Sequence, residues 1–390
     1  MKITFAGVVP LIGGMMFGAE KATGSKPEYL LSYPAFYGND HLLTDYWPDV
    51  PYHNLDPETN TISVDLPKVD FVAALCPCAG LSQLNNGKKR GADAPQNDWM
   101  YKSTEYILEF AQPKVLWGEN APGLYGPVGV PVVERLRAIG EKFGYSMSLL
   151  KTSSLLHGVP QNRIRSFYFF WKSETAPILN WKKKDHTPLP EYLAQIKDNL
   201  DPDDVERKTA DLQNDPLFMW LKKEYGTGWR DLIQKYKKSM MDVVILTGRV
   251  YELIEWTKEN HPGAEKRFEH AAFKRAKGMG FWDFSPFVPT DATGALTGAR
   301  MNAIHPTEER LITQKELMHM MCLPIDMYVG ERDIAKIFQN VPSTTVADWT
   351  GEVIKFIEGK LEFSDKSFIK QDNINQRMDA VTEKSSVPLF

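Results

Sequence analysis

The chain has 390 residues, of which 43% are hydrophobic and 25% charged, and its formal net charge is −4. This composition is ordinary for a soluble globular protein, and the length allows two domains. The three cysteines are too few for a disulfide framework, which favours a reducing compartment. The net charge excludes a surface coated in positive charge, but a local basic cleft could still bind a nucleic acid.

No uninterrupted apolar run of membrane length is present, so we expect no membrane contact. Residues 3–17 are apolar enough to resemble a signal peptide, but Pro10, several glycines and Glu20 interrupt the pattern. We therefore expect a cytoplasmic protein. Cys76 and Cys78 are spaced C-x-C without a second Cys/His pair, so we also expect no metal site.

Strand and helix patterns alternate over residues 1–172. Short apolar runs that end at glycine, proline or polar residues are typical of buried strands, and longer segments with helical periodicity predict helices. The predicted strands cover residues 3–7, 29–33, 69–75, 113–117, 146–150 and 166–171, and the predicted helices cover 98–111 and 132–143. Buried strands that alternate with helices predict an α/β fold with a doubly wound, mostly parallel sheet.

The alternation stops near Lys172. Residues 173–302 are rich in Lys, Asp, Trp and Tyr and predict a second, smaller and irregular domain. Within them, residues 201–236 have a charged helical pattern, and residues 243–246 predict a strand.

Helical patterns return at residues 313–321 and 346–359. We therefore expect residues 303–362 to return to the first domain. Residues 363–390 are polar and predict a loosely attached tail.

The most informative segment follows the third predicted strand. Cys76, Pro77 and Cys78 stand where that strand should end, and residues 87–90 add a glycine followed by three cations. A thiol at the carboxyl end of a strand, beside a basic loop, suggests a nucleophile that works next to phosphates. Taken alone, the segment slightly favours two small buried cysteines or half of a metal site.

Other candidate residues also follow predicted strands. Gly7, Gly13 and Gly14 form a glycine-rich turn after the first strand, where a nucleotide-like cofactor could approach the backbone and the next helix. Glu119 ends another central strand, a place where a lone acid is more often structural. These signals are weak when each is taken separately.

Two further patterns involve charged residues near the ends of predicted elements. Alternation along an extended strand places Gln161, Arg163 and Arg165 on one face, where the arginines need anionic or polar partners. A salt-bridged sheet edge would explain them equally. Thr313 and Glu316 have the spacing of a helix-capping box, which is compatible with any function.

In this order, the stretches resemble the motifs of the cytosine-5 DNA methyltransferases. Residues 5–7 resemble the family's Phe-x-Gly cofactor motif, and residues 77–82 resemble its Pro-Cys-Gln-x-x-Ser nucleophile motif. Glu119 and Asn120 match its Glu-Asn motif. The order and the separations make the combination specific.

The later motifs follow in the family's order. Gln161, Arg163 and Arg165 match the Gln-x-Arg-x-Arg motif. Residues 310–324 resemble the Arg-x-Leu-Thr-x-x-Glu motif and its continuation, and residues 340–342 resemble the final Gly-Asn-x-Val-Pro motif. The resemblance implies a Rossmann-like methyltransferase fold, with a target-recognition domain in the variable middle of the chain.

The sequence departs from the family pattern mainly around the implied cofactor site. Residues 8–12 are inserted in the first motif, and Ser32 stands near the place where the family has an acid that holds the cofactor ribose. Ala79 replaces the glutamine of the nucleophile motif, and Gln339 replaces the glycine of the last motif.

The resemblance implies a DNA (cytosine-5-)-methyltransferase of a bacterium or virus, acting in restriction-modification. S-adenosylmethionine would be its methyl donor, and double-stranded DNA would be the partner of a monomeric enzyme. Cys78 would attack carbon 6 of a flipped-out cytosine. Glu119 would bind ring nitrogen 3 and the exocyclic amine, while Arg165, with Arg163, would support the thiolate and the ring oxygen.

The resemblance also implies binding residues. The cofactor site would include Phe5, Gly7, Gly14, Asp56, Asn340 and Val341. The DNA contacts would include Ser82, Lys88, Lys89, Arg90 and Gln161. We expect the glycine-containing basic segment 79–97 to close over bound DNA.

Three alternatives stay open from the sequence: an RNA cytosine-5 methyltransferase, a non-catalytic DNA-binding relative, and an enzyme that transfers a larger group from a modified cofactor. The length of the middle domain favours DNA, because reading a duplex requires a module that fills a groove. The missing ribose acid motivates the non-catalytic alternative, and Cys78, Glu119 and Arg165 oppose it.

Overall fold

The computed structural model describes residues 2–75, 80–82, 91–278, 286–297 and 303–375, together with the backbone of 377–380. The chain divides into two compact units, of which the first comprises Met1–His186 and Met321–Phe390 and the second comprises Thr187–Met320. Residues 303–320, which we expected in the first domain, belong to the second unit. Within the described ranges, no helix is long and apolar enough to cross a membrane.

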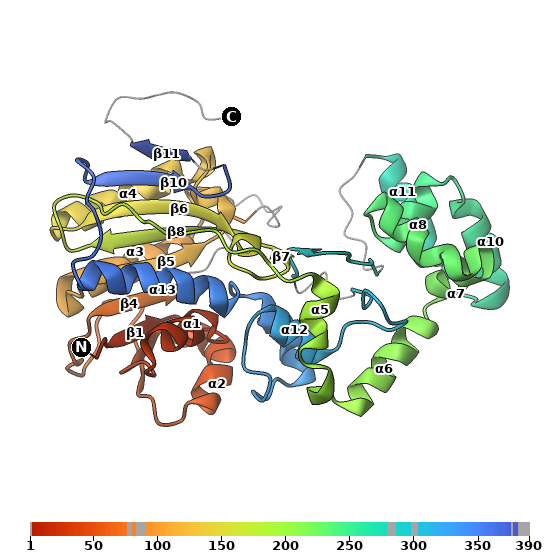
Figure 1. Cartoon of the computed structure of the whole chain (residues 1–390), viewed down its shortest axis with the longest axis horizontal. Coiled ribbons are helices and arrows are strands. Elements are labelled where there is room, and N and C mark those ends of the chain that lie inside the picture. Colours follow the sequence, from red (N-terminus) through yellow and green to blue (C-terminus); the bar gives the residue numbers. More distant parts are fainter. Residues whose placement is uncertain are drawn as a thin grey trace. The chain divides into compact units, whose positions relative to one another are not determined.

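A nine-stranded sheet organises the described part of the first unit, in the order β11-β10-β6-β8-β5-β4-β1-β2-β3 (Figure 1). Neighbouring strands are parallel except where β8 and β11 pair. This confirms the predicted fold class. The strands are β1 (Phe5–Val8), β2 (Leu30–Ser32), β3 (Tyr52–Asn54), β4 (Phe71–Leu75), β5 (Val115–Asn120), β6 (Ser146–Ser153), β8 (Ile164–Trp171), β10 (Phe368–Asp372) and β11 (Arg377–Ala380).

The strand order reverses beside β1. The chain runs from β1 outward to β2 and β3, and then returns to β4 on the other side of β1. In open α/β sheets, ligands bind outside the carboxyl ends of the strands at such a reversal. The segments that follow β1 and β4 are therefore the places where the fold itself predicts a ligand site.

Helices cover both faces of this sheet (Figure 1). One face carries α1 (Gly14–Thr23) and α13 (Ser343–Ile357), and the other carries α3 (Asn97–Tyr106) and α4 (Val130–Lys142). Side chains of β8 alternate between these layers. Phe167 and Phe169 contact Trp349 of α13, whereas Tyr168 and Phe170 belong to the core that includes residues of α3 and α4.

The segment from residue 364 corrects the expectation of a loosely attached tail. β10 pairs in parallel with β6, with Phe368 opposite Met147, and both Phe368 and Ile369 are buried. Two adjacent apolar side chains are a weak signal in a polar segment. The unpaired backbone of an edge strand such as β6 supplies the further reason for a strand here.

The second unit is mainly helical in its described residues. Its helices are α5 (Leu189–Ala194), α6 (Pro202–Gln213), α7 (Pro216–Tyr225), α8 (Trp229–Tyr236), α9 (Met240–Leu246), α10 (Val250–Asn260), α11 (Glu265–Ala276) and α12 (Gln314–Met320). Its core includes Trp220, Trp229 and Phe268. This unit therefore has an apolar core of its own.

The strand predicted at residues 243–246 is wrong, because this segment is the end of α9. The side chain of Ser239 caps the helix by accepting a hydrogen bond from the backbone N–H of Asp242. Met240, Val243 and Val244 are buried at helical spacing. The β-branched residues Val243, Val244 and Ile245 favour a strand, but the Ser239 cap and the burial of one helix face stabilise a helix.

The contact between α1 and α13 predicts a sharp difference between two glycine substitutions. A Cβ on Gly18 would lie 2.4 Å from Cβ of Val346 and 2.5 Å from the carbonyl oxygen of Ser343. Because one neighbour is backbone, a rotamer change cannot remove the clash. We expect Gly18→Ala to lower the free energy of unfolding by about 1–3 kcal/mol, measured by urea denaturation.

Gly351→Ala is the matched control, because Gly351 lies in α13 and a Cβ there would meet nothing within 4 Å. Alanine is the better helix former, so we expect this variant to be up to about 1 kcal/mol more stable than the wild type. Equal stability of the two variants would contradict the close packing of α1 on α13.

Candidate active site

Two neighbouring strands bring the expected catalytic segments together at one edge of the sheet. Leu75, the last residue of β4, pairs in register with Glu119 near the end of β5. Cys78 follows Leu75 by three positions in the sequence, and together with Cys76 it lies outside the described residues. The register therefore places Leu75, the last described residue before Cys76, beside Glu119.

Glu119 and Arg165 form an ion pair in a largely buried position. Oε1 of Glu119 lies 2.8 Å from Nε of Arg165, and the two side chains are 3% and 17% exposed. β8 runs antiparallel to β5, so the beginning of β8 meets the end of β5. A carboxylate from one strand and a guanidinium from the next therefore share one small volume.

Burial raises the pKa of Glu119, because a desolvated carboxylate is less stable than the neutral acid. The charges of Arg165 and Arg163 oppose this rise. A carboxyl group with a raised pKa keeps its proton at a pH where an ordinary glutamate is ionised. Such a group can donate a hydrogen bond or a proton to a basic ring nitrogen.

Arg163 lies deeper than Arg165 and connects two parts of the first unit. Its side chain is buried, and Nη2 donates a hydrogen bond to the carbonyl oxygen of Phe338 at 2.5 Å. Phe338 directly precedes the segment that contains Asn340. Arg163 thus links the start of β8 to the segment expected to close the cofactor site.

Gln161, which we expected to contact DNA, is also fully enclosed by protein. Its Nε2 donates to Sδ of Met321 at 3.5 Å. This placement supports the backbone near β8, and it does not present the side chain at the surface.

The described ends of the basic segment are held by hydrogen bonds. The backbone N–H of Gly91 donates to the carbonyl oxygen of Gly80 at 2.8 Å. Nδ2 of Asn97 donates to the carbonyl oxygens of Gly91 and Ala92 at 3.0 and 2.9 Å. Ser82 is half-buried, whereas Lys88, Lys89 and Arg90 lie outside the described residues.

The nucleophile segment also packs against the segment that follows Glu119. A Cβ on Gly123 would lie only 2.3 Å from the carbonyl oxygen of Leu81. Gly123 is therefore required by this backbone contact. The chain after Cys78 and the chain after Glu119 support each other directly.

Phe5 and Gly7, expected at the cofactor, both have partners inside the protein. Phe5 is buried and its ring stacks on Phe71, with centroids 5.2 Å apart. A Cβ on Gly7 would lie 2.2 Å from Sδ of Met16, so glycine is needed for the packing of α1. Neither residue needs a ligand to explain its type.

Asn340 is different, because the structure leaves its amide without a partner. The side chain is 1% exposed, and neither Oδ1 nor Nδ2 forms a hydrogen bond among the described residues. A Cβ on Gly14 would lie 2.8 Å from Cβ of Asn340 and 3.0 Å from the carbonyl oxygen of Val341. The amide therefore lies near the N-terminal end of α1, where backbone N–H groups are unpaired.

Buried polar groups are nearly always hydrogen-bonded, so an enclosed amide without partners points to a polar ligand. Asn340 can offer one acceptor and two donors, and the N-terminus of α1 favours negative charge. This combination fits an amino acid moiety that carries an ammonium group and a carboxylate.

Asp56 follows β3 and is exposed. Its Oδ1 accepts hydrogen bonds from the backbone N–H groups of Glu58 and Thr59, both at 2.8 Å. These bonds lower the pKa of Asp56. Oδ1 of Asp56 thus stabilises the turn formed by residues 56–59.

No sequence pattern marked two further buried groups. Nδ1 of His157 pairs with Oδ2 of Asp348 at 2.8 Å, and Nε2 contacts Oγ1 of Thr152 at 2.9 Å, at the end of β6. Asp40 accepts three hydrogen bonds near the end of β2. Both depend on partners distant in the sequence, so only the folded chain reveals them.

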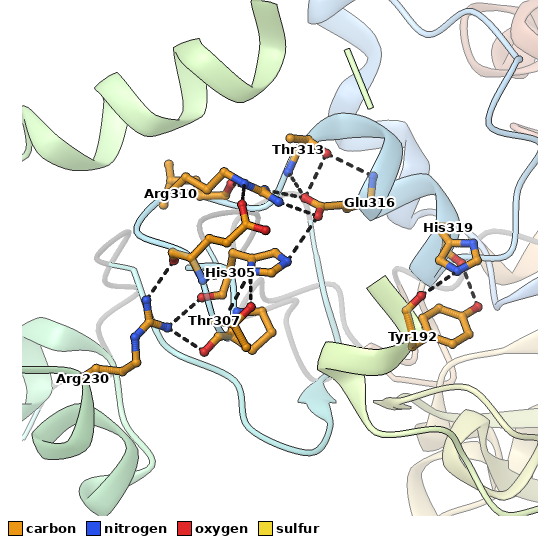
Figure 2. Close-up of polar contacts among 11 residues, drawn as sticks. Tyr192, Arg230, His305, Thr307, Arg310, Thr313, Glu316 and His319 are labelled. Atoms are coloured by element: carbon orange, nitrogen blue, oxygen red, sulfur yellow. Dashed lines mark hydrogen bonds and ion pairs between the residues drawn. The ribbon is translucent and has the colours of Figure 1, made fainter. Parts of the chain in front are cut away.

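The second unit contains a buried polar cluster around Glu316 (Figure 2). Arg310 binds this carboxylate through two hydrogen bonds of 2.7 and 2.8 Å, and the N–H of Thr313 donates to it at 2.8 Å. The N–H of Glu316 donates back to Oγ1 of Thr313, which confirms the predicted capping box. Glu316 therefore both caps α12 and neutralises a buried arginine.

The same cluster fixes the chain before Arg310 (Figure 2). Arg230 of α8 donates hydrogen bonds to the carbonyl oxygens of His305, Pro306 and Glu308, each at 2.8 Å. Nε2 of His305 lies 3.5 Å from Oε1 of Glu316. The segment that leads to Arg310 is thus fixed to α8, a helix that contributes to the core of the second unit.

The family model of the C-5 cytosine-specific DNA methylases matches residues 12–346 of this chain. The chain belongs to this family. Among its relatives, the type II methyltransferase M.FnuDI of Fusobacterium nucleatum is 27% identical over 154 residues, which are 38% of this chain and 44% of that protein. The type II methyltransferase M.NgoPII of Neisseria gonorrhoeae is 25% identical over 208 residues, 50% of this chain and 58% of that protein. The matched segments thus span about half the length of these relatives.

Solved structures share the methylase fold. A DNA modification methyltransferase encoded within an Escherichia coli prophage superposes with a TM-score of 0.57 at 14% identity, covering 92% of this chain and 99% of that one. The Entamoeba histolytica methyltransferase EhMeth gives a TM-score of 0.55 at 12% identity with the same coverage. At such low identity these likenesses establish the fold alone.

The buried carboxyl of Glu119 predicts how the stability of this methylase depends on pH. Because its pKa is raised on folding, its stabilising contribution is fully present below the ordinary glutamate pKa and is lost as pH rises through the folded-state value. Glu119→Gln removes this dependence. We therefore expect the stability of the variant, relative to the wild type, to rise in urea unfolding experiments as the pH is increased above the ordinary glutamate range.

The exposed Glu109→Gln is the control for loss of a carboxyl group, and we expect a clearly smaller trend from it. A relative stability of Glu119→Gln that falls with rising pH would show that Arg165 and Arg163 outweigh burial at this site.

Proposed function

We propose that this protein is a DNA (cytosine-5-)-methyltransferase that uses S-adenosylmethionine and forms a covalent adduct through Cys78. The buried pair of Glu119 and Arg165, beside the end of β4, is the observation that carries the proposal. A protonatable carboxyl and a guanidinium at one strand end match the two polar edges of a cytosine ring. The name type II methyltransferase, carried by the relatives, supports a role in restriction-modification.

The proposed reaction begins at carbon 6 of cytosine, because carbon 5 is a poor nucleophile in the intact ring. The Cys78 thiolate adds to carbon 6 and forms a carbon–sulfur bond. Glu119 donates its proton to ring nitrogen 3, and Arg165 holds the ring oxygen. The displaced electron pair then makes carbon 5 nucleophilic.

S-adenosylmethionine, when bound, supplies the electrophilic methyl group that carbon 5 acquires. A base removes the proton from carbon 5, and the electron pair of that bond restores the double bond as the Cys78 thiolate leaves. Glu119 recovers its proton from nitrogen 3. Methylated cytosine is released as the product and the free thiolate is regenerated, so Cys78 is not consumed in the reaction.

Asn340 and Gly14 would hold the amino acid end of this cofactor. Their support is the unpartnered amide beside the N-terminal end of α1. Val341 lines the same place through its backbone, and Phe5 and Gly7 belong to β1, which leads to the turn before α1. Asp56 has one carboxylate oxygen outside its own turn that could bind the adenine amine.

The target base must leave the duplex, which costs a few kcal/mol. We assign closure over the DNA to residues 79–97, with Ser82, Lys88, Lys89 and Arg90 near phosphates. The hydrogen bonds between Gly80, Gly91 and Asn97 supply a fixed base for this movement. The second unit, with its own core, would read the sequence of the duplex.

A trapping experiment tests the chemistry. Duplex DNA with 5-fluorocytosine cannot lose its carbon 5 substituent, so the adduct should persist in the presence of S-adenosylmethionine. We expect a denaturation-resistant complex on a protein gel with the wild type and with Cys76→Ser. Cys78→Ser should abolish it, because the bond to carbon 6 can no longer form.

The binding of the same DNA by Cys78→Ser, measured by fluorescence anisotropy, separates chemistry from recognition. Intact binding by the wild type without any adduct would overturn the catalytic proposal. An adduct that is lost in Cys76→Ser and kept in Cys78→Ser would show that Cys76, and not Cys78, is the nucleophile. Adduct formation only with single-stranded RNA of the same sequence would replace DNA by RNA as substrate.

A further inference from the structure

A buried carboxylate connects the two places where the sequence departs from its family around the cofactor site. Asp40 of α2 (Tyr37–Tyr46) has no exposed surface. Its Oδ2 accepts hydrogen bonds from Oγ of Ser32 at 2.5 Å and from the hydroxyl of Tyr52 at 2.9 Å. Its Oδ1 accepts from the backbone N–H of Leu11 at 2.8 Å. One side chain thus joins β2, β3 and the inserted loop 8–12.

The inserted loop needs such an anchor because its backbone is strained. Val9 and Leu11 have φ angles of 48° and 50°, in the left-handed region that is unfavourable for these residues. Residues in this conformation persist only where their surroundings hold them. The N–H of Val9 donates to the carbonyl oxygen of Leu31 at 2.7 Å, and Asp40 holds the N–H of Leu11.

α2 contacts the same turn and also the segment that precedes Asn340. A Cβ on Gly13 would lie 2.7 Å from Cδ1 of Leu43, so α2 packs directly on the end of the inserted loop. His41 lies 3.5 Å from Asp333, and Lys336 donates to the carbonyl oxygen of Gly38. These residues of α2 therefore contact both the turn that begins α1 and the segment that leads to Asn340.

A carboxylate is chemically suited to this position. It can accept all three hydrogen bonds at once, with no need for any of the three donors to change its role. A buried carboxylate is costly unless such bonds compensate it. Among the described residues, no Lys or Arg forms an ion pair with Asp40, so the hydrogen bonds offset part of this cost, and burial still raises the pKa of Asp40.

We propose that Asp40 is a positioning residue for the cofactor site, which fixes Leu11 and Ser32 so that the ribose end can bind without an acid at the end of β2. The inference rests on the proposed use of S-adenosylmethionine. Nucleotide-binding α/β folds commonly place an acid near the end of β2 that contacts the ribose directly. Here the acid comes from α2, is enclosed, and has both oxygens engaged, so it acts through its neighbours.

Binding of S-adenosylhomocysteine, an unreactive relative of the cofactor, tests this role by calorimetry without any turnover. Asp40→Ala removes all three acceptors, and we expect Kd to rise by about tenfold or more, which is about 1.4 kcal/mol. Asp40→Asn keeps an oxygen for the N–H of Leu11, while its amide can donate to the hydroxyls of Ser32 and Tyr52, which can reverse their roles. We expect this conservative variant to restore most of the affinity.

Tyr52→Phe is the matched control, because it loses a hydrogen bond to the same carboxylate on the side of β3. We expect it to lower stability while Kd stays within about twofold of the wild type. Ser32→Ala, which loses a bond on the side of β2, should raise Kd. Equal effects of Ser32→Ala and Tyr52→Phe on Kd would reduce Asp40 to a general stabilising role and overturn the proposal.

A ribose-modified ligand distinguishes positioning from direct contact. The 2′-deoxy form of S-adenosylhomocysteine should lose the same factor in affinity with the wild type and with Asp40→Asn. Unequal factors would make Asp40 a direct ribose ligand and overturn the proposal. If the wild type and Asp40→Ala bind S-adenosylhomocysteine with the same Kd, the role of Asp40 is overturned while the proposed function stands. Absence of binding by the wild type would overturn the proposed function itself.

Discussion

The desolvation of Glu119 is the constraint on which the proposed site depends. A carboxyl group at the end of a buried strand is costly to ionise, and Arg165 compensates that cost only while β5 and β8 keep their antiparallel register. The rest of the edge is built around this pair. Leu75 pairs with Glu119, and Gly123 packs on Leu81. A shift of one strand would therefore disturb the pair of Glu119 and Arg165 and the contacts of the chain before and after Cys78 together.

Much of the sheet could be predicted from the sequence because buried parallel strands consist of short apolar runs with clear ends. The positions of Glu119 and Arg165 followed from the same reasoning, since each lies where such a run ends or begins. The remaining differences depend on a helix cap and on contacts that are distant in the sequence. Residues 243–246 have the composition of a strand, but Ser239 caps a helix there. Phe368 joins the sheet because β6 offers an edge, which no local pattern could show.

Asp40 and Asn340 illustrate the same limit within the site. The sequence showed that an acid was missing near Ser32, but it could not show that a helix supplies one from behind. The motif around Asn340 predicted a residue near the cofactor, whereas the folded chain adds that its amide has no hydrogen-bond partner among the described residues. Several glycines also have a different reason from the expected one. Gly7 and Gly18 allow helices to pack closely, and only Gly14 lies beside the unpartnered amide.

The packing of Asn340 on Gly14 has a consequence for the synthesis of the protein. The two residues lie near opposite ends of the chain, and α1 packs on α13, which follows Asn340 directly. Contacts between such distant segments form late and slow the folding of a chain. A ribosome-bound chain that already contains Cys78, Glu119 and Arg165 would still lack this wall of the proposed cofactor site. Under the proposed function, the cofactor site would therefore be completed only after most of the chain has been synthesised.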